Sequence, residues 1–202
     1  MHLMAIHGYD DLLKDVLATC EHLAFQATNF QVYPIHTAIL NRQLNAVQQL
    51  LQIKGMDAVG DENKRNALHY AVIYGNPEIV SVCCQHSTDL DAKDNDGMTA
   101  LMMAAKDGNL AAVEELIKKG ATPLLIDSFG KNILHYAVES EHADLVAWIL
   151  KNIKIDVNSK DEEGKTALYY AQNPESFNVN SQIEELLVAK GATNPDSKLL
   201  TN

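Results

Sequence analysis

The stretch DNDGMTALMMAAKDG, residues 94–108, decides the fold because near-copies of it recur along the chain at a fixed interval. The copies are DENKRNALHYAVIYG from Asp61, DSFGKNILHYAVESE from Asp127 and DEEGKTALYYAQNPE from Asp161. Their starting points lie 33, 33 and 34 residues apart, and a degenerate copy, TNFQVYPIHTAILNR, begins one interval earlier at Thr28. A repeat of this length predicts an array of small supersecondary units that stack on one another.

Two patterns inside each copy predict two helices. The first pattern is an alanine at the same position of every copy, as expected where two helices approach too closely for a larger side chain. The second pattern is Val-x-x followed by two apolar residues, which is the stripe of an amphipathic helix. A Thr or Asn stands before each first helix, where its side-chain oxygen can cap free amides. The alanines are Ala38, Ala71, Ala104, Ala137 and Ala171, and the capping residues are Asn66, Thr99, Asn132 and Thr166.

These in-phase copies resemble the ankyrin-repeat family, whose unit is a β-turn and two helices with a Thr-Pro-Leu-His signature. The resemblance implies an all-α ankyrin-repeat solenoid of stacked helix-turn-helix units joined by β-turn loops. The signature appears as YPIH (33–36), NALH (66–69), TALM (99–102), NILH (132–135) and TALY (166–169).

The resemblance also implies the division of the chain. The last repeat carries three extra residues within 173–181, which predicts a longer loop between its helices. We expect a degenerate N-terminal half-repeat at 1–26, ankyrin repeats at 27–60, 61–93, 94–126 and 127–160, a C-terminal capping ankyrin repeat at 161–194, and a tail at 195–202.

The composition favours a protein partner over nucleic acid. A chain of 202 residues, 47% of them hydrophobic, can bury a core. The formal net charge of −11 argues against nucleic acid, because phosphate neutralisation needs clustered Lys and Arg. Cys20, Cys83 and Cys84 form no disulfide framework and indicate a reducing compartment. We expect a monomeric cytoplasmic protein without a membrane span or secretory signal; delivery into a host cell by another route stays open.

The acidic loop from Asp94 to Gly97 has a second interpretation, a calcium site. An EF-hand loop places glycine sixth, which would make Ala92 the first residue and Met103 the twelfth. Those positions require Asp and Glu. We therefore interpret the loop as a turn in which Asp94 accepts hydrogen bonds from nearby backbone amides.

No catalytic arrangement is visible. His36, His69 and His135 recur at one motif position without a Ser or Cys nucleophile beside them, which favours structural hydrogen bonding. Cys83 and Cys84 occupy the apolar column of a second helix, where core packing is a better interpretation than metal binding. The nucleophile elbow, the phosphate-binding loop and His-Glu-x-x-His are missing. We predict a non-enzymatic protein that needs no cofactor and no metal.

The resemblance implies a concave binding surface made of turn tips and the exposed sides of the short first helices. Phe30 and Phe129 at turn tips either contact the partner or pack against their own loops. We expect a patch of solvent-exposed apolar residues edged by lysines. The candidate protein-binding residues are Phe30, Arg65, Ile73, Tyr74, Met98, Lys106, Asp107, Phe129, Lys131 and Lys165.

Two further positions are of interest. Trp148 either makes a second contact on the outer face or packs between outer helices. The stretch LKNIKIDVN, 150–158, resembles the loop in which ankyrin repeats can be asparagine-hydroxylated, which would place the modification at Asn158.

We interpret the chain as a non-catalytic protein–protein interaction module that acts as an adaptor, scaffold or inhibitor. One alternative is a regulatory or targeting ankyrin domain of a larger enzyme, because the chain enters its repeat pattern in mid-unit. The other is an ankyrin effector that an intracellular microbe delivers into a host cell.

Overall fold

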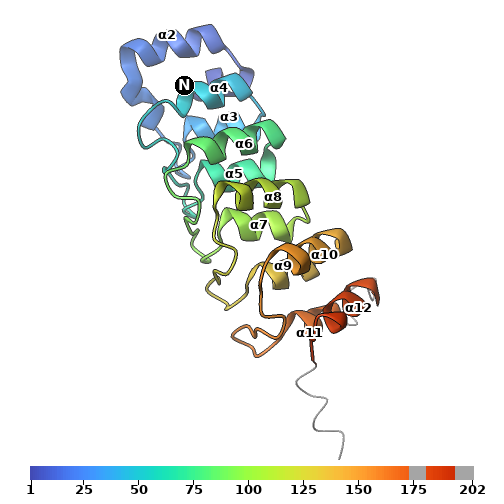
Figure 1. The fold of residues 1–202 in the computed structure, drawn as a ribbon. Helices are drawn as coiled ribbons and strands as arrows, with labels where there is room; N and C mark the ends of the chain where they lie inside the picture. The colour runs from blue at the N-terminus through green and yellow to red at the C-terminus, as the bar shows by residue number, and fades with distance from the viewer. Residues whose placement is uncertain (173–180, 194–202) are drawn as a thin grey trace, which may run out of the picture.

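The computed structural model describes residues 1–172 and 181–193, which form twelve α-helices and one 3₁₀ helix, η1. Within these ranges the only strand-like element is an isolated bridge between Lys160 and Thr166. The helices come in pairs along the chain (Figure 1). The pairs are α1 (His2–His7) with α2 (Asp10–Cys20), α3 (Pro34–Leu40) with α4 (Leu44–Leu50), α5 (Ala67–Tyr74) with α6 (Pro77–His86), α7 (Ala100–Lys106) with α8 (Leu110–Lys119), α9 (Ile133–Glu139) with α10 (Ala143–Asn152), and α11 (Ala167–Ala171) with α12 (Ser181–Ala189); η1 (Glu21–Phe25) follows α2.

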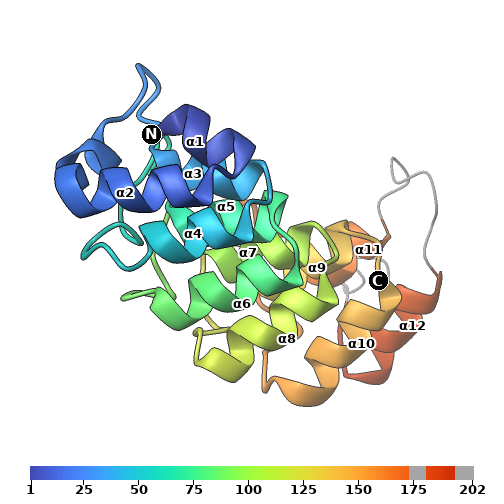
Figure 2. The same ribbon diagram turned by 90° about the horizontal axis from the view of Figure 1, so that it is seen from above.

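The pairs stack in sequence order, so that the chain builds a solenoid with its N-terminal and C-terminal pairs at opposite ends (Figures 1 and 2). Each first helix contacts the first helix of the next pair, from α1 through to α11. The predicted all-α solenoid is confirmed. The boundaries of the individual repeats stay predictions, and the longer loop predicted at 173–181 lies almost wholly outside the described residues.

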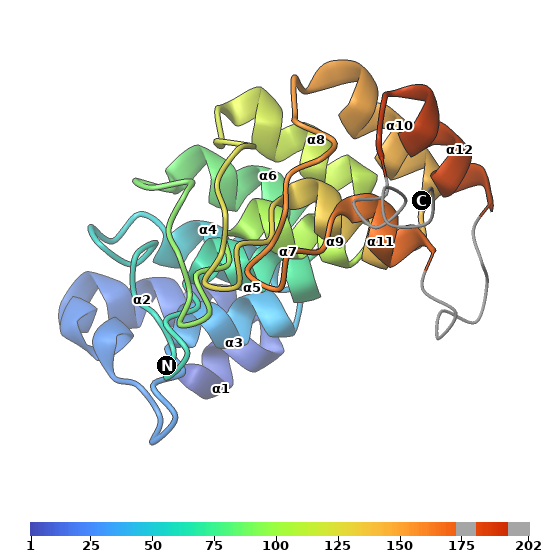
Figure 3. The same cartoon turned by 90° about the horizontal axis from the view of Figure 1, so that it is seen from below.

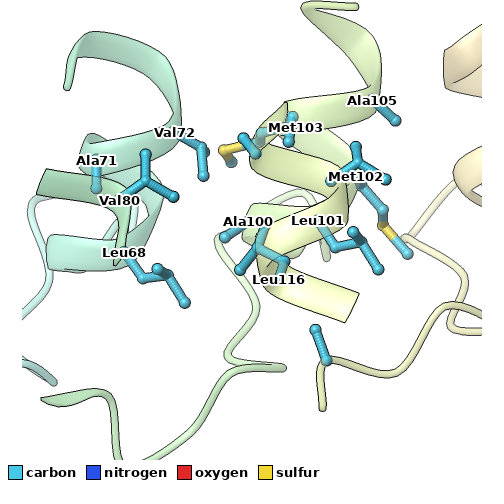
Figure 4. Close-up of a cluster of buried hydrophobic side chains, with 14 of the residues drawn as sticks. Leu68, Ala71, Val72, Val80, Ala100, Leu101, Met102, Met103, Ala105 and Leu116 are labelled. Carbon is cyan, nitrogen blue, oxygen red and sulfur yellow. The ribbon is translucent and has the colours of Figure 1, made fainter. Parts of the chain in front are cut away.

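The alanine column forms the contact between first helices. All five alanines are buried, and Ala38, Ala104 and Ala137 have no exposed surface. A methyl group is the largest side chain that lets neighbouring first helices pack this closely. Around Ala104, Met103 reaches from α7 toward Val72 on α5, whereas Met102 reaches to the opposite side (Figure 4).

The stripe of each second helix is buried against the first helices. Val113 and Leu116 of α8 have no exposed surface. Cys83 and Cys84 of α6 stand where α8 has Leu116 and Ile117, and both cysteines are buried. Burial raises the pKa of both thiols, to about 11 for Cys84. The two cysteines are therefore protonated packing residues at neutral pH, as the repeat pattern predicts.

The predicted capping residues begin the helices as expected. The side-chain oxygens of Asn66 and Asn132 each accept two first-turn amides, and those of Thr99 and Thr166 each accept one. Each cap satisfies donors that the helix itself cannot pair.

The histidine column joins two of the first helices, α3 and α5, to the loops that follow them. His69 Nδ1 accepts the Asn66 amide at 3.2 Å, and His69 Nε2 donates to the Met98 carbonyl at 3.2 Å. His36 makes the same pair of contacts, its Nε2 lying 3.1 Å from the Val59 carbonyl. His135 keeps the Nδ1 contact, but its Nε2 is buried without a hydrogen-bond partner. The structural role predicted for these residues is confirmed.

The turns that open the repeats form a ladder along one side of the solenoid (Figure 3). Asp94 Oδ1 accepts the amides of Asp96 at 2.9 Å and Met98 at 3.0 Å. This is the turn predicted for the loop in place of a calcium site. The amide of Asn95 then donates to the Asn63 carbonyl of the preceding turn at 2.9 Å. Equivalent bonds from Ser128 to Asp96 and from Glu162 to Phe129 continue the ladder.

We predict that the histidine column makes stability depend on pH. Burial lowers the pKa of His36 to about 4 and also lowers the pKa values of His69 and His135. The unfolded chain binds these protons near pH 6.5, whereas the folded chain does not, so the stabilisation is full above pH 6.5 and is lost as the pH falls. His36 alone should account for up to about 3 kcal/mol between pH 6.5 and 4. Urea unfolding at pH 7, 5.5 and 4.5, followed by circular dichroism, measures the slope.

His36→Gln removes one titrating group and should flatten that slope, although it lowers stability at pH 7. An unchanged slope in this variant would show that His36 is not responsible for the pH dependence.

We predict a larger loss of stability for Gly97→Ala than for Gly164→Ala. Both glycines have φ of +77°, so an added Cβ costs about 1 kcal/mol at either position. At Gly97 the Cβ would also lie 2.7 Å from the Ser128 amide of the next turn, whereas at Gly164 it would meet no atom within 4 Å. Overpacking of this kind costs roughly 1–3 kcal/mol more. Equal losses in urea unfolding would disprove tight packing between successive turns.

Candidate functional site

The turn tips and the exposed sides of the first helices form one continuous side of the solenoid, which we call the inner face. Two hollows lie on it. The Tyr136 hollow, of about 520 Å³, is lined by Lys106, Phe129, Lys131, Tyr136, Glu139, Asp161, Glu162, Glu163, Lys165 and Tyr170. The Met103 hollow, of about 160 Å³, is lined by Arg65, Ile73, Met98, Met103, Lys106 and Asp107. Lys106 belongs to both.

Eight of the ten candidate residues line these hollows, and the structure therefore brings them together. Phe30 and Tyr74 lie outside both. The Tyr74 ring packs against Tyr70, with ring centroids 5.5 Å apart, and its backbone carbonyl accepts the Arg42 guanidinium. Phe30 is exposed at its turn tip, as is Phe129.

The prediction that Met98 is solvent-exposed is wrong. Only 6% of Met98 is exposed, and its side chain packs with the buried core as one wall of the Met103 hollow. The charged residues in the same column, Arg65, Lys131 and Lys165, keep part of their side chains in water because their charged ends must stay hydrated. Methionine has no charged end, so it folds against Ile73 and Met103.

A tyrosine column, which the sequence analysis missed, supports the inner face. Tyr70 donates its hydroxyl proton to Asp61 Oδ2 at 3.0 Å, nine residues earlier in the chain. Burial and the neighbouring carboxylate raise the pKa of each tyrosine in the column well above its usual range, so the phenols remain neutral donors. The signal in the sequence is an Asp and a Tyr nine residues apart, in the pairs Asp61–Tyr70, Asp127–Tyr136 and Asp161–Tyr170.

Lysine ammonium groups alternate with these tyrosine rings in the Tyr136 hollow. Lys131 Nζ lies 4.4 Å from the centre of the Tyr170 ring, 5.7 Å from that of Tyr136, and 2.5 Å from Glu139 Oε1. Lys106 Nζ lies 5.8 Å from the centre of the Tyr136 ring. The cations and rings attract one another, so the hollow is a polar, aromatic surface whose side chains are held in place before any partner arrives.

The repeat at 94–126 breaks the tyrosine column, because Met103 stands where the repeats at 61–93, 127–160 and 161–194 have tyrosine. The second oxygen of Asp94 therefore lacks a phenol, and Arg65 of the preceding repeat donates to it instead, with Nε 3.3 Å from Oδ2. Burial raises the pKa of the nearby Asp107 carboxyl, although the adjacent Lys106 acts in the opposite direction.

Two positions outside the inner face were also singled out by the sequence. Trp148 is half-buried and packs against the core, in line with the packing interpretation. The Asn158 side chain joins two loops, because its Nδ2 donates to the Gly191 carbonyl and its Oδ1 accepts the Thr193 amide. Hydroxylation of Asn158 stays a prediction.

Within residues 1–172 and 181–193, no three His, Cys, Asp or Glu side chains come together in a way that could hold a metal ion. None of the helices described is long and apolar enough to cross a membrane.

The sequence matches the family described as ankyrin repeats (3 copies) over residues 1–94, 82–161 and 123–198. It is 31% identical to the neurogenic locus notch homolog protein 1 of Xenopus laevis over 163 residues, which is 80% of this chain and 6% of that protein. It is 28% identical to the ANK repeat-containing protein nipk-1 of Caenorhabditis elegans over 95% of this chain and 37% of that protein. The chain therefore spans 6% of the length of the first relative and 37% of the length of the second.

Two crystal structures have a similar fold. An ankyrin repeat domain from Acinetobacter baumannii AYE gives a TM-score of 0.82 with 23% sequence identity, over 95% of this chain and 97% of that one. The ankyrin repeat domain of Bcl-3 also gives a TM-score of 0.82, with 22% identity, over 95% of this chain and 86% of that one. Because the family match runs from residue 1 to residue 198, the chain belongs to the ankyrin-repeat family.

Proposed function

We propose that this chain is a non-catalytic protein-interaction module that binds a protein partner on its inner face, as an adaptor, scaffold or inhibitor. The observation that carries the proposal is the pair of adjoining hollows that share Lys106. Ankyrin repeat domains are typically protein-binding modules, and this supports the same conclusion.

The chemistry of the inner face suits a protein partner. Aromatic side chains and arginine are the residue types enriched among interface hot spots. Tyr74 and Phe129 are 39% and 56% exposed, and Arg65, in the same repeat as Tyr74, has its guanidinium held by Asp94 of the next repeat. Side chains that are already ordered lose little conformational entropy on binding, which favours affinity.

An alternative proposal is that the chain is the regulatory or targeting ankyrin domain of a longer protein. The matched relatives support it, because the similar region makes up 6% and 37% of their lengths. Sequencing the full transcript tests this proposal. An open reading frame that adds a catalytic domain would favour it, and one that ends with this chain would exclude it.

We predict that the triple variant Tyr74→Ala, Lys106→Ala, Phe129→Ala keeps the fold and weakens partner binding at least about tenfold. Lys106 and Phe129 are exposed, so each of those changes should alter the free energy of unfolding by about 0.5 kcal/mol or less, whereas Tyr74→Ala also loses the contact with the Tyr70 ring and should cost about 1 kcal/mol. The loss of two aromatic contacts and one cation at an interface costs more than 1.4 kcal/mol, which is tenfold. Quantitative pull-down with mass spectrometry measures the binding, and circular dichroism the fold.

The matched control is Gln48→Ala, Gln85→Ala, Glu114→Ala, which changes three exposed residues on the second helices. It should capture the same proteins as the unaltered chain. If the inner-face variant also captures them undiminished, the inner face is not the binding site.

A further inference from the structure

The Met103 hollow arises where three residues differ from the residues at the same positions of the following repeats. The Tyr136 ring of the next repeat has two ammonium groups near its centre, that of Lys106 at 5.8 Å and that of Lys131 at 5.7 Å. The residues 33 positions earlier are Met103, Ile73 and Met98 respectively. A ring with two ammonium groups near its centre is thus replaced by three apolar side chains that line a hollow.

The size and lining of the hollow suit a single aromatic ring. Its volume is about 160 Å³. An apolar cavity of about 150 Å³ is large enough to bind benzene. Met98 and Met103 are 6% and 4% exposed and form the floor with Ile73. Thioether sulfurs make favourable contacts with aromatic rings, and the unbranched methionine side chains can adjust to the shape of a ring.

The rim of the hollow carries charges that also favour a ring. Arg65 is held in place by Asp94, and Lys106 is exposed at the edge shared with the Tyr136 hollow. Both cations can lie over the negative face of an aromatic ring. A saturated apolar side chain has no negative ring face, so it would not compensate the two cations for the water that they lose.

We infer that the Met103 hollow receives one aromatic side chain, a phenylalanine or tyrosine, of the protein partner. This inference rests on the proposed function and adds the chemistry of the anchor. In this repeat the partner's ring would occupy the place that the chain's own tyrosine rings occupy in the repeats on either side.

The first experiment uses small probes on the whole protein labelled with ¹³C at the methionine methyl groups. The probes are p-cresol and toluene, the side-chain analogues of tyrosine and phenylalanine. The control is 4-methylcyclohexanol, which has no ring current, and its affinity is measured by its ability to displace p-cresol. We expect saturable, ring-current shifts of the Met98 and Met103 methyl signals with a dissociation constant on the order of 1 mM. The signal of Met56, which is buried elsewhere in the core, should not move.

Variants at residue 103 then test the hollow itself. Met103→Tyr restores the side chain of the column and should abolish the saturable shift at Met98. Met103→Phe fills the same space without a hydroxyl and should do the same. Met103→Leu conserves volume and should keep the Met98 response within about threefold. Circular dichroism establishes that each variant is folded.

The inference fails if the unaltered protein shows no saturable shifts, if 4-methylcyclohexanol binds as tightly as p-cresol, or if the folded Met103→Tyr variant still responds. Such a result leaves the proposed function standing if the Tyr74, Lys106 and Phe129 variant still loses its partner. If instead that variant keeps its partner, the inner face itself is the wrong surface.

Discussion

One buried carboxylate in each of four turns organises the rest of its unit. Asp61, Asp94, Asp127 and Asp161 are each 6–7% exposed, and in each the first oxygen accepts two backbone amides of its own turn. An unpaired buried carboxylate would cost several kcal/mol, so these bonds must all form together. The turn that results sets the position of the helix cap, the first helix and the bond to the preceding turn. The second oxygen accepts a hydrogen bond from a side chain on the inner face. The identity of that side chain determines the character of the surface in that repeat.

The inner face differs between repeats through that second oxygen. Where a tyrosine donates to it, as Tyr70, Tyr136 and Tyr170 do, an aromatic ring lies on the inner face, and lysine ammonium groups lie close to the rings of Tyr136 and Tyr170. Where Met103 replaces the tyrosine, Arg65 crosses from the preceding repeat to satisfy Asp94, and an apolar hollow lies beside it. A solenoid needs only its buried columns to stay constant, so the exposed columns are free to carry a binding surface of their own.

Much of this architecture was predictable from single columns of residues. The alanines, the Asn and Thr caps, the structural histidines and the buried cysteine pair all follow from local rules of packing and capping, and the structure has them as predicted. Eight of the ten candidate binding residues also line the two hollows, because their columns face one side of the stack. The burial of Met98 and the tyrosine–aspartate pairs were not predicted. The exposure of Met98 was predicted from its column, whose other members are charged or half-buried. Each tyrosine–aspartate pair joins a turn to a helix residue nine positions later in the chain.

The sequence by itself determined the repeat length, the helix pairs and the family, because a 33-residue period with fixed caps and small residues permits one way of stacking. Only the tertiary structure decided which inner-face residues meet water. The exposure of these residues depends on three successive repeats. Ile73 comes from the first, Met98, Met103 and Lys106 come from the second, and Lys106 lies near Tyr136 of the third. The exposure of a side chain is a property of its neighbours across the stack, and those neighbours lie a full repeat away in the chain.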